Sequence, residues 1–361
     1  MEQAKVLVGM SGGVDSAAAA LLLQNEGLRP VGCTLRLYDG QGAGGPQEGG
    51  CCSLEDVEAA RDTARRLGMD FFVFNFSRQF QQHVMDNFVA AYQAGLTPNP
   101  CVRCNQRVKF SALLQRADEL DIRFIATGHY ARVAWSDTAG RWQLLRGRDR
   151  RKDQSYVLYP LSQQLLARLL LPVGEYGKAE IRSMAEAAGF ANAHKKDSQD
   201  ICFIPDGDYP GFLARYGGVE LIPGDFVDPC GQVLGRHRGL PCYTTGQRRG
   251  LGISADRPLY VLRRDPARNT VVLGDEADLY TRTVWAEDFN WVSLPPQEAP
   301  LAVTAKTRYS QSESAATLFP EEGGRVRLEF EIPQRAVTAG QSLVAYGGEA
   351  VAGGGVITGS E

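Results

Sequence analysis

One stretch near the start of the chain combines glycines, hydroxyls and a carboxylate in a pattern that suits phosphate binding. It reads Gly9-Met10-Ser11-Gly12-Gly13-Val14-Asp15-Ser16 and separates a strand-like run from an alanine-rich, helix-like run. Glycines let the backbone approach a ligand closely, and successive N–H groups at a helix N-terminus attract anions. Asp15 would repel phosphate unless a bound Mg2+ ion neutralised both charges. The stretch therefore predicts a site for ATP and Mg2+, without the Gly-Lys-Ser/Thr ending of kinase-like loops.

Three of the eight cysteines stand in segments that suit sulfur chemistry. Cys101 and Cys104 open a predicted helix, and the pKa of a thiol is lowered at a helix N-terminus and beside cations such as Arg103. Cys202 lies far along the chain, in the segment 197–204. Two distant cysteines together with a predicted ATP loop indicate a sulfur relay, in which a persulfide on one cysteine delivers sulfur to an activated carbon.

Strand and helix signals that would position these groups alternate over the first two hundred residues. Apolar, β-leaning runs occur at 5–9, 31–37, 70–76 and 123–126. Runs with an apolar residue every three or four positions occur at 16–25, 54–67, 79–92 and 105–120. Strands that alternate with helices of this length predict an α/β fold. Its parallel sheet would be covered on both faces and would bind ligands at the carboxyl ends of the strands.

The sequence pattern changes after about residue 206. A further helical pair is predicted at 164–170 and 178–188, and beyond it Gly and Pro become frequent while helical periodicity fades. Short β-rich segments then appear at 259–263, 270–273, 302–308, 326–332 and 342–345. We therefore predict three domains, namely an α/β catalytic domain at 1–206, a β-rich middle domain at 207–278 and an antiparallel β-barrel at 279–361.

The composition is typical of a globular protein, with 43% hydrophobic and 22% charged residues and a net charge of −3. No run of about 18 apolar residues occurs, and no cleavable signal precedes the first strand-like run, so we expect a cytoplasmic protein with no membrane partner. Two local groups of basic residues nevertheless suit a polyanion. One group holds six basic residues between 141 and 152, and the other consists of Arg236, Arg238, Arg248 and Arg249.

Eight segments spread over nearly the whole chain match one known family. They are 11–16, 51–53, 75–76, 97–105, 126–132, 153–156, 197–204 and 245–252. With these segments the chain resembles the bacterial tRNA uridine 2-sulfurtransferases, whose loop belongs to the ATP pyrophosphatase type. The resemblance implies an ATP-pyrophosphatase catalytic domain of the adenine-nucleotide α-hydrolase kind, and a C-terminal barrel that contacts tRNA.

The resemblance also implies a reaction and a set of site residues. ATP would adenylate O2 of the wobble uridine in glutamate, glutamine and lysine tRNAs, releasing pyrophosphate and then AMP. Cys202 would carry a persulfide supplied through a cysteine desulfurase or a sulfur-relay protein, and Cys104 would form a disulfide with it as sulfur is transferred. Leu35 and Gly128 would line the adenosine site. The positions that would contact tRNA are Asn99, Pro100, Cys101, His129, Lys152, Asp153, Gln154, Arg308, Tyr309 and Gln341.

Other hypotheses stay open at this point. Cys101, Cys104 and Cys202 together supply three thiolates, which suits a [4Fe-4S] cluster with one open iron that would hold sulfide in place of the persulfide. An amidotransferase or a tRNA-lysidine synthetase could use the same loop, although neither requires the spaced Cys104 and Cys202. A non-catalytic RNA-binding or redox-sensing protein is a further alternative, against which the intact loop argues.

Overall fold

The structure is a computed structural model that describes residues 3–38, 53–195 and 201–361. Its first sheet is parallel, with strand order β3-β2-β1-β4-β7. The strands are β1 (Lys5–Gly9), β2 (Arg29–Arg36), β3 (Phe71–Asn75), β4 (Phe124–Thr127) and β7 (Leu169–Leu170). The chain passes to one side of β1 for β2 and β3 and to the other side for β4, so the strand order reverses at β1. Such a reversal leaves a crevice at the carboxyl ends of the strands.

Alternating side chains of β1 bind helices to both faces of this sheet. Val6 and Val8 pack in one apolar cluster with α1 (Val14–Asn25) and α2 (Leu54–Arg66), whereas Leu7 packs in another cluster with α6 (Phe110–Glu119). This period of two is what a strand buried on both faces requires. The predicted α/β fold is therefore confirmed.

Two long helical runs agree with the predictions at 79–92 and 105–120. The first joins α3 (Ser77–Phe80), η1 (Gln81–Met85) and α4 (Asp86–Gln93), and the second joins α5 (Pro100–Cys104), η2 (Asn105–Lys109) and α6. Both contain a π-helical turn, a feature that often accompanies functional sites. The predicted helix at 178–188 is α8 (Lys178–Ala187).

The predicted helix at 164–170 is wrong in its second half. The helix α7 (Gln163–Leu166) ends after one turn, and Leu169 and Leu170 form the edge strand β7 beside β4. A run of leucines satisfies both periodicities, and pairing with β4 decides between them. The sequence prediction also missed α9 (Tyr209–Gly217), because Pro210 and Gly211 in its first turn obscure the helical pattern.

The middle and C-terminal parts are built from β-strands, as predicted. The middle sheet has the order β10-β11-β8-β9, formed by β8 (Gly224–Val227), β9 (Val233–His237), β10 (Tyr260–Asp265) and β11 (Thr270–Gly274). The C-terminal strands run in the order β12-β15-β14-β13-β16-β17, and pairing of β12 with β17 closes them into an antiparallel barrel. These strands are β12 (Tyr280–Asn290), β13 (Leu301–Lys306), β14 (Ser314–Pro320), β15 (Val326–Arg335), β16 (Ser342–Gly347) and β17 (Ala350–Ser360).

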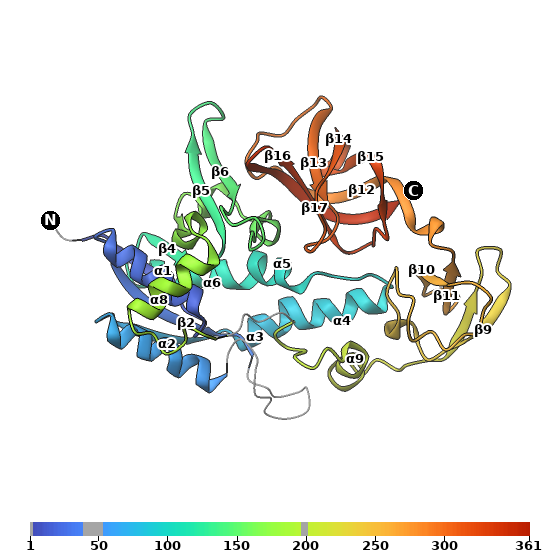
Figure 1. Ribbon diagram of the computed structural model, residues 1–361, viewed down its shortest axis with the longest axis horizontal. Coiled ribbons are helices and arrows are strands. Elements are labelled where there is room, and N and C mark those ends of the chain that lie inside the picture. Colours follow the sequence, from blue (N-terminus) through green and yellow to red (C-terminus); the bar gives the residue numbers. More distant parts are fainter. Residues whose placement is uncertain (1–2, 39–52, 196–200) are drawn as a thin grey trace.

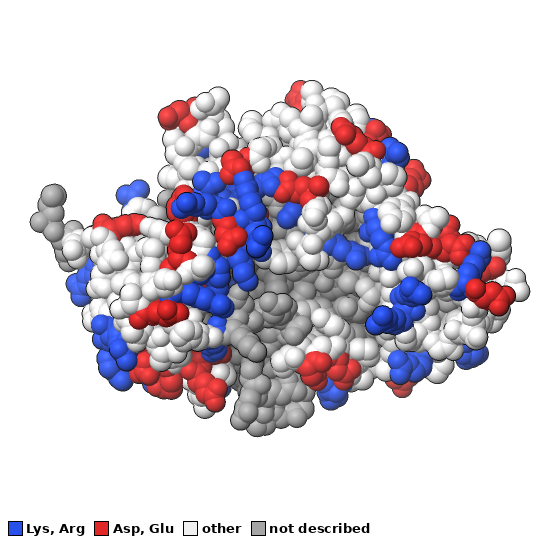
Figure 2. Space-filling model, in the orientation of Figure 1, with Lys and Arg blue, Asp and Glu red and all other residues white. Residues whose placement is uncertain are grey.

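The three parts surround a central region that contains α5 (Figure 1). The parallel sheet and the middle sheet lie toward opposite ends of the long axis, and the barrel stands above the helices between them (Figure 1). Lys and Arg side chains gather near the base of the β5–β6 hairpin, formed by β5 (Ala131–Ser136) and β6 (Arg141–Arg146), and again between the barrel and the middle sheet (Figure 2). Within the described ranges, no helix is long and apolar enough to cross a membrane.

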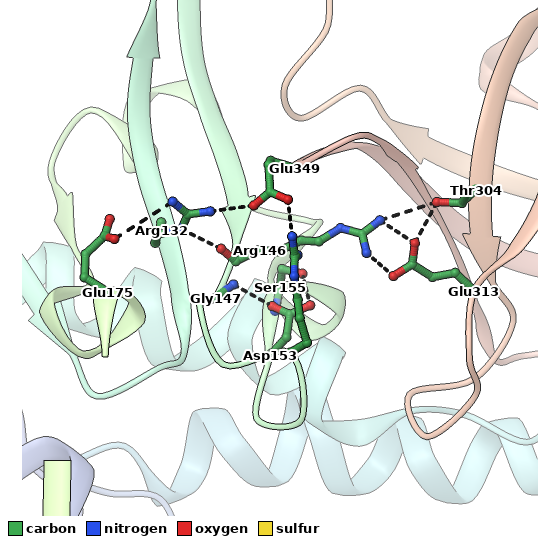
Figure 3. A network of polar contacts seen from close by, with 10 residues as sticks. Arg132, Arg146, Gly147, Asp153, Ser155, Glu175, Thr304, Glu313 and Glu349 are labelled. Atoms are coloured by element: carbon green, nitrogen blue, oxygen red, sulfur yellow. Dashed lines mark hydrogen bonds and ion pairs between the residues drawn. The ribbon is translucent and has the colours of Figure 1, made fainter. Parts of the chain in front are cut away.

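The β5–β6 hairpin joins the catalytic part to the barrel. It was not predicted, and its strand β6 extends the barrel sheet by pairing Leu145 with Ala350 of β17. Side chains reinforce this junction, because Arg146 is 8% exposed and pairs with Glu313, while Arg132 and Arg150 both pair with Glu349 (Figure 3). At least four of the six basic residues at 141–152 are thus engaged within the protein, since Arg141 donates to the carbonyl of Trp291 and Arg148 donates to the carbonyl of Glu175.

Breaking the Arg146–Glu313 pair should weaken the junction. Burial raises the pKa of Glu313, but hydrogen bonds from Arg146 and Thr304 outweigh it and hold that pKa below its ordinary value. We expect Arg146→Met to lower the free energy of unfolding by about 3 kcal/mol, because Glu313 would remain half-buried and charged. Arg150→Met removes an exposed pair with Glu349 and should cost less than about 1 kcal/mol. Equal shifts of the urea unfolding midpoint in the two variants would contradict this prediction.

Candidate active site

The loop at 9–16 follows β1 and leads into α1, as the sequence predicted. The Met10 amide donates to the carbonyl of Cys33 on β2 at 2.7 Å, which fixes the start of the loop. The Ser16 hydroxyl accepts from the Ser11 amide at 3.2 Å and donates to the carbonyl of Gly13 at 3.0 Å. Gly13 is the N-cap of α1, so the positive end of the helix faces the loop. This arrangement is a backbone cradle for an anion.

Two glycines are required by close backbone contacts around this cradle. Gly12 has φ +72°, and a Cβ atom there would lie 2.4 Å from the carbonyl oxygen of Asp56. A Cβ atom on Gly128, just after β4, would lie 2.6 Å from the backbone of Asp15 and Ser16. Leu35 lies near the end of β2, buried to 8% exposure. The predicted ATP residues therefore meet at the carboxyl edge of the sheet, where the strand order reverses.

Asp15 is neutralised by a residue that the sequence interpretation missed. The ammonium group of Lys178, at the first position of α8, lies 2.7 and 2.8 Å from the two carboxylate oxygens of Asp15. The Tyr130 hydroxyl donates to the same carboxylate at 2.7 Å. Lys178 is 8% exposed and the Asp15 side chain is 29% exposed, so the pair is partly shielded from water. A lysine at a helix start usually points into solvent, so the sequence gives no sign of this role. Only the contact with Asp15, which is 163 residues away in the sequence, reveals it.

The segment 152–154 is connected to the same carboxylate through Tyr130. The Gln154 side chain accepts a hydrogen bond from the Tyr130 amide at 2.9 Å. Asp153 accepts from the Gly147 amide at 3.0 Å and from the Ser155 amide at 3.1 Å, so it holds the turn between β6 and Ser155 in shape. The sequence resemblance assigned these residues to tRNA, and the structure gives the Asp153 and Gln154 side chains contacts within the protein. They hold the turn between β6 and Ser155, which contacts Tyr130 and through it Asp15 of the proposed ATP cradle.

The cysteines lie on two segments that share one apolar core. The Asn99 side chain caps α5 by accepting from the Cys101 amide at 3.1 Å, and Pro100 occupies the first helical position. Cys101 is exposed, Cys104 one turn later is buried, and both the Cys104 and Cys202 side chains border the same cluster. Phe203 anchors the third cysteine, because its ring packs against the rings of Phe80, Phe88 and Phe212.

The arrangement does not support an iron–sulfur cluster. Among the residues that the structure describes, which include all three of these cysteines, no group of three Cys, His, Asp or Glu side chains could hold a metal ion. We therefore do not propose a [4Fe-4S] cluster on Cys101, Cys104 and Cys202. Asp15 supplies one carboxylate, already compensated by Lys178, so the described part of the chain shows no dedicated Mg2+ site either.

Residues from the barrel lie close to the Asn99–Cys104 segment. The Tyr309 ring packs edge-on against Tyr156 at 5.8 Å, and its pKa is raised by burial and by the charges of Asp153 and Cys101. The Gln341 amide donates to the carbonyl of Thr97 at 2.9 Å. Arg308 donates to the carbonyl of Ala336 and to the Thr338 hydroxyl within the barrel. Of the predicted tRNA positions of the barrel, Gln341 thus contacts the loop that precedes Cys101, and Tyr309 contacts Tyr156, whereas Arg308 is held within the barrel.

Comparison with known proteins finds matches along nearly the whole chain. Residues 4–206 match the family described as tRNA methyl transferase HUP domain, 210–275 match its PRC-barrel domain, and 281–357 match an aminomethyltransferase β-barrel domain. Proteins named tRNA-specific 2-thiouridylase MnmA are similar in sequence. The protein from Moorella thermoacetica is 48% identical over 97% of this chain and 98% of its own length, and that from Acetivibrio thermocellus is 45% identical over 99% and 100%.

The chain belongs to the tRNA-specific 2-thiouridylase family. A third 2-thiouridylase, from Heliobacterium modesticaldum, is 47% identical over 98% of this chain and 92% of its own length. The family resemblance found in the sequence is thereby confirmed, as is the sequence of α/β, middle and barrel domains. Some matching segments fall partly outside the described residues, namely Cys51 and Cys52 and the positions 197–200.

His129 of this 2-thiouridylase-family chain should remain uncharged at neutral pH. Burial, together with the charge of Lys109, holds its pKa well below the ordinary 6.5, and its Nδ1 lies 2.7 Å from the Thr127 hydroxyl. Because the unfolded chain binds the proton more tightly, the free energy of unfolding should fall as the pH drops below 6.5. We expect His129→Gln to leave the salt dependence of tRNA binding unchanged at pH 7 to 8. A side-chain NMR titration near 6.5 would contradict the neutral assignment.

Proposed function

We propose that this protein is an ATP-dependent tRNA uridine 2-sulfurtransferase, which forms 2-thiouridine at the wobble position. The observation that carries the proposal is full-length similarity to proteins named tRNA-specific 2-thiouridylase, over 97% or more of this chain. The phosphate cradle and the two cysteines that border one core are the groups that adenylation and sulfur transfer require. A tRNA substrate further implies a cytoplasmic enzyme. The domain boundaries at 206/207 and 278/279 are part of the same proposal.

The first step activates the base. The loop at 9–16 holds the phosphates of ATP, while Leu35 and Gly128 line the adenosine side of the cradle. The uridine O2 attacks the α-phosphorus of ATP, a P–O bond breaks, and pyrophosphate leaves with both electrons of that bond. Mg2+ fits here as an ion that enters with the ATP phosphates and offsets their charge. Lys178 keeps Asp15 from repelling the incoming phosphates, since it compensates that carboxylate directly.

The second step moves sulfur. The terminal sulfur of a Cys202 persulfide attacks C2 of the adenylated uridine, and AMP leaves with the electrons of the C–O bond. The Cys104 thiolate then attacks the Cys202 sulfur, forming a Cys104–Cys202 disulfide and leaving a thiocarbonyl on the base. A thiol reductant must reopen this disulfide, and a cysteine desulfurase or sulfur-relay protein must restore the persulfide. Burial of Cys104 and partial burial of Cys202 protect these intermediates from water.

The RNA contacts complete the proposal. We assign glutamate, glutamine and lysine tRNAs as substrates and assign their contacts to the predicted positions on both domains. These are Asn99, Pro100, Cys101, His129, Lys152, Asp153, Gln154, Arg308, Tyr309 and Gln341. Tyr309 is 45% exposed beside α5, so its ring is available for stacking on an unstacked base.

Pyrophosphate release tests the adenylation step and separates the rival activities. With ATP, unmodified glutamate tRNA and no sulfur donor, we expect pyrophosphate to form only when the tRNA is present. An amidotransferase would need glutamine instead, and a tRNA-lysidine synthetase would need lysine. A non-catalytic RNA-binding protein would release no pyrophosphate under any of these conditions. Pyrophosphate that forms equally without tRNA would overturn the proposed order of steps.

A further inference from the structure

The turn at 244–252 in the middle domain is braced by internal hydrogen bonds, although it lies on the surface. The Gln247 side chain accepts from the Thr244 amide at 3.0 Å and donates to the carbonyl of Arg249 at 2.9 Å, so it spans the turn from one side to the other. Gly246, Gly250 and Gly252 have φ of +86°, +75° and +70°, values that favour glycine. The turn matches a family segment in the sequence, yet the catalytic proposal gives it no role.

This turn presents the charged side chains of Arg248 and Arg249 to solvent. Arg248 and Arg249 are both exposed, and within the part of the chain that the structure describes neither forms an ion pair. Other arginines of the same domain differ, since Arg236 pairs with Asp225 at 3.4 Å and Arg257 pairs with Asp275 at 2.8 Å. A fixed backbone that carries two uncompensated guanidinium groups fits phosphate groups, which arginine binds with a planar pair of donors.

The turn also adjoins the barrel residues that lead to the cysteines. A Cβ atom on Gly246 would lie 3.0 Å from Ala336 and 3.6 Å from the guanidinium of Arg335. The carbonyl of Ala336 accepts from Arg308, whose neighbour Tyr309 packs against Tyr156. Basic side chains occupy the same face of the molecule between the barrel and the middle sheet (Figure 2). The barrel edge at Ala336 therefore links the turn to Arg308 and its neighbour Tyr309.

Next to the arginines the chain folds around a shallow hollow. Residues 248–259 enclose about 210 Å³, with Arg248 and Arg257 among the lining side chains. Leu251 anchors this segment, since it is 8% exposed and packs in the core of the middle domain with Phe226 and Val261. The hollow therefore lies beside Arg248, on a segment that Leu251 anchors to the core of the middle domain.

We propose that the 244–252 turn binds the phosphate backbone of the tRNA outside the anticodon loop, through Arg248 and Arg249. This inference rests on the proposed function, because it takes tRNA as the substrate. When the wobble base reaches the cysteines, the rest of the RNA must leave the site along a neighbouring surface. The turn lies on the middle domain, toward the far end of the molecule from the parallel sheet, which suits a second anchor (Figure 1). Its contribution is to affinity and orientation and not to base recognition.

Binding of unmodified glutamate tRNA at several salt concentrations, without ATP or sulfur donor, tests this surface. We expect Arg248→Ala/Arg249→Ala to bind roughly tenfold more weakly and to lower the slope of log K against log salt by about 2. Arg236→Ala is the matched control, since it removes an exposed arginine of the same domain that already has a carboxylate partner. We expect the control to bind within about twofold of the unaltered protein. If the double variant binds like Arg236→Ala, the proposal is overturned.

Phosphate ethylation interference locates the contact and separates this proposal from the proposed function. We expect phosphates outside the anticodon loop to interfere with binding to the unaltered protein and to lose that effect in the double variant. Interference confined to the anticodon loop would overturn the placement. If the unaltered protein formed no 2-thiouridine but still bound tRNA in an Arg248- and Arg249-dependent way, the proposed function would fail and the surface would stand.

Discussion

Cys202→Ser should abolish 2-thiouridine formation while leaving the protein folded and able to adenylate tRNA. A hydroxyl cannot carry a persulfide, so the rate of sulfur transfer should fall by roughly 10³-fold or more, the scale on which enzymes lose activity with their nucleophile. Pyrophosphate release in a single turnover should persist, because the ATP cradle at 9–16 shares no residue with the cysteine segment. Nucleoside mass spectrometry and pyrophosphate release measured on the same sample separate the two steps.

Two other cysteines provide controls for this prediction. Cys33 is fully buried in β2, and burial raises its pKa to about 12, which makes it an inert thiol. Cys230 is exposed on the middle domain, away from the shared core. We expect Cys230→Ser to retain full activity, and we expect persulfide-specific alkylation to label Cys202 and not Cys33. Thiolation by Cys202→Ser at the unaltered rate would remove Cys202 from the mechanism.

Lys178→Met should impair the use of ATP, with the second largest effect that we expect. The substitution leaves the Asp15 carboxylate without its cation at the N-terminal end of α1, where we propose that the phosphates of ATP bind. We expect kcat/KM for ATP in tRNA-dependent pyrophosphate release to fall by about 10²-fold or more, through electrostatic repulsion in a shielded site. Thermal unfolding measured alongside reports whether the fold is retained, since an unpaired buried charge also destabilises a protein.

Conservative and compensating variants distinguish an electrostatic role from simple loss of the fold. Lys178→Arg keeps the positive charge beside Asp15 and should retain most of the activity. Asp15→Asn/Lys178→Met removes both charges, so it should be more stable than Lys178→Met alone and should regain part of the affinity for ATP. If Lys178→Met folds normally and its KM for ATP is unchanged, the role of the ion pair in the ATP site is wrong.

Local sequence patterns predicted the parts of the molecule that depend on local physics. The strand, the glycine loop and the alanine-rich helix at 5–25 were predictable, because the spacing of apolar residues and the conformational freedom of glycine act over a few residues. The helix start at Asn99 and Pro100 was predictable for the same reason, since capping joins neighbours in the chain. The conformation of the glycine loop and the Cys101–Cys104 helix therefore follow from the amino-acid sequence alone.

Features made by distant segments leave no local signal in the sequence. The β5–β6 hairpin belongs to the barrel sheet only because Leu145 pairs with Ala350, a register that nothing near residue 145 specifies. Lys178 acquires its role through Asp15, which is 163 residues away in the sequence. Gln341 makes its contact with Thr97 only because the barrel docks on the α/β part. The sequence thus indicated the chemistry, while tertiary contacts determine how the groups are held.

The most direct test of the central claim is nucleoside mass spectrometry of unmodified glutamate tRNA. The RNA is incubated anaerobically with the full-length protein, ATP, Mg2+ and a cysteine desulfurase system that generates persulfide. We predict that 2-thiouridine appears at the wobble position, that it requires ATP, and that it is absent with Cys202→Ser. A methylated uridine in its place, or an unmodified uridine after complete incubation with folded protein, would contradict the assignment of this chain as a tRNA 2-sulfurtransferase.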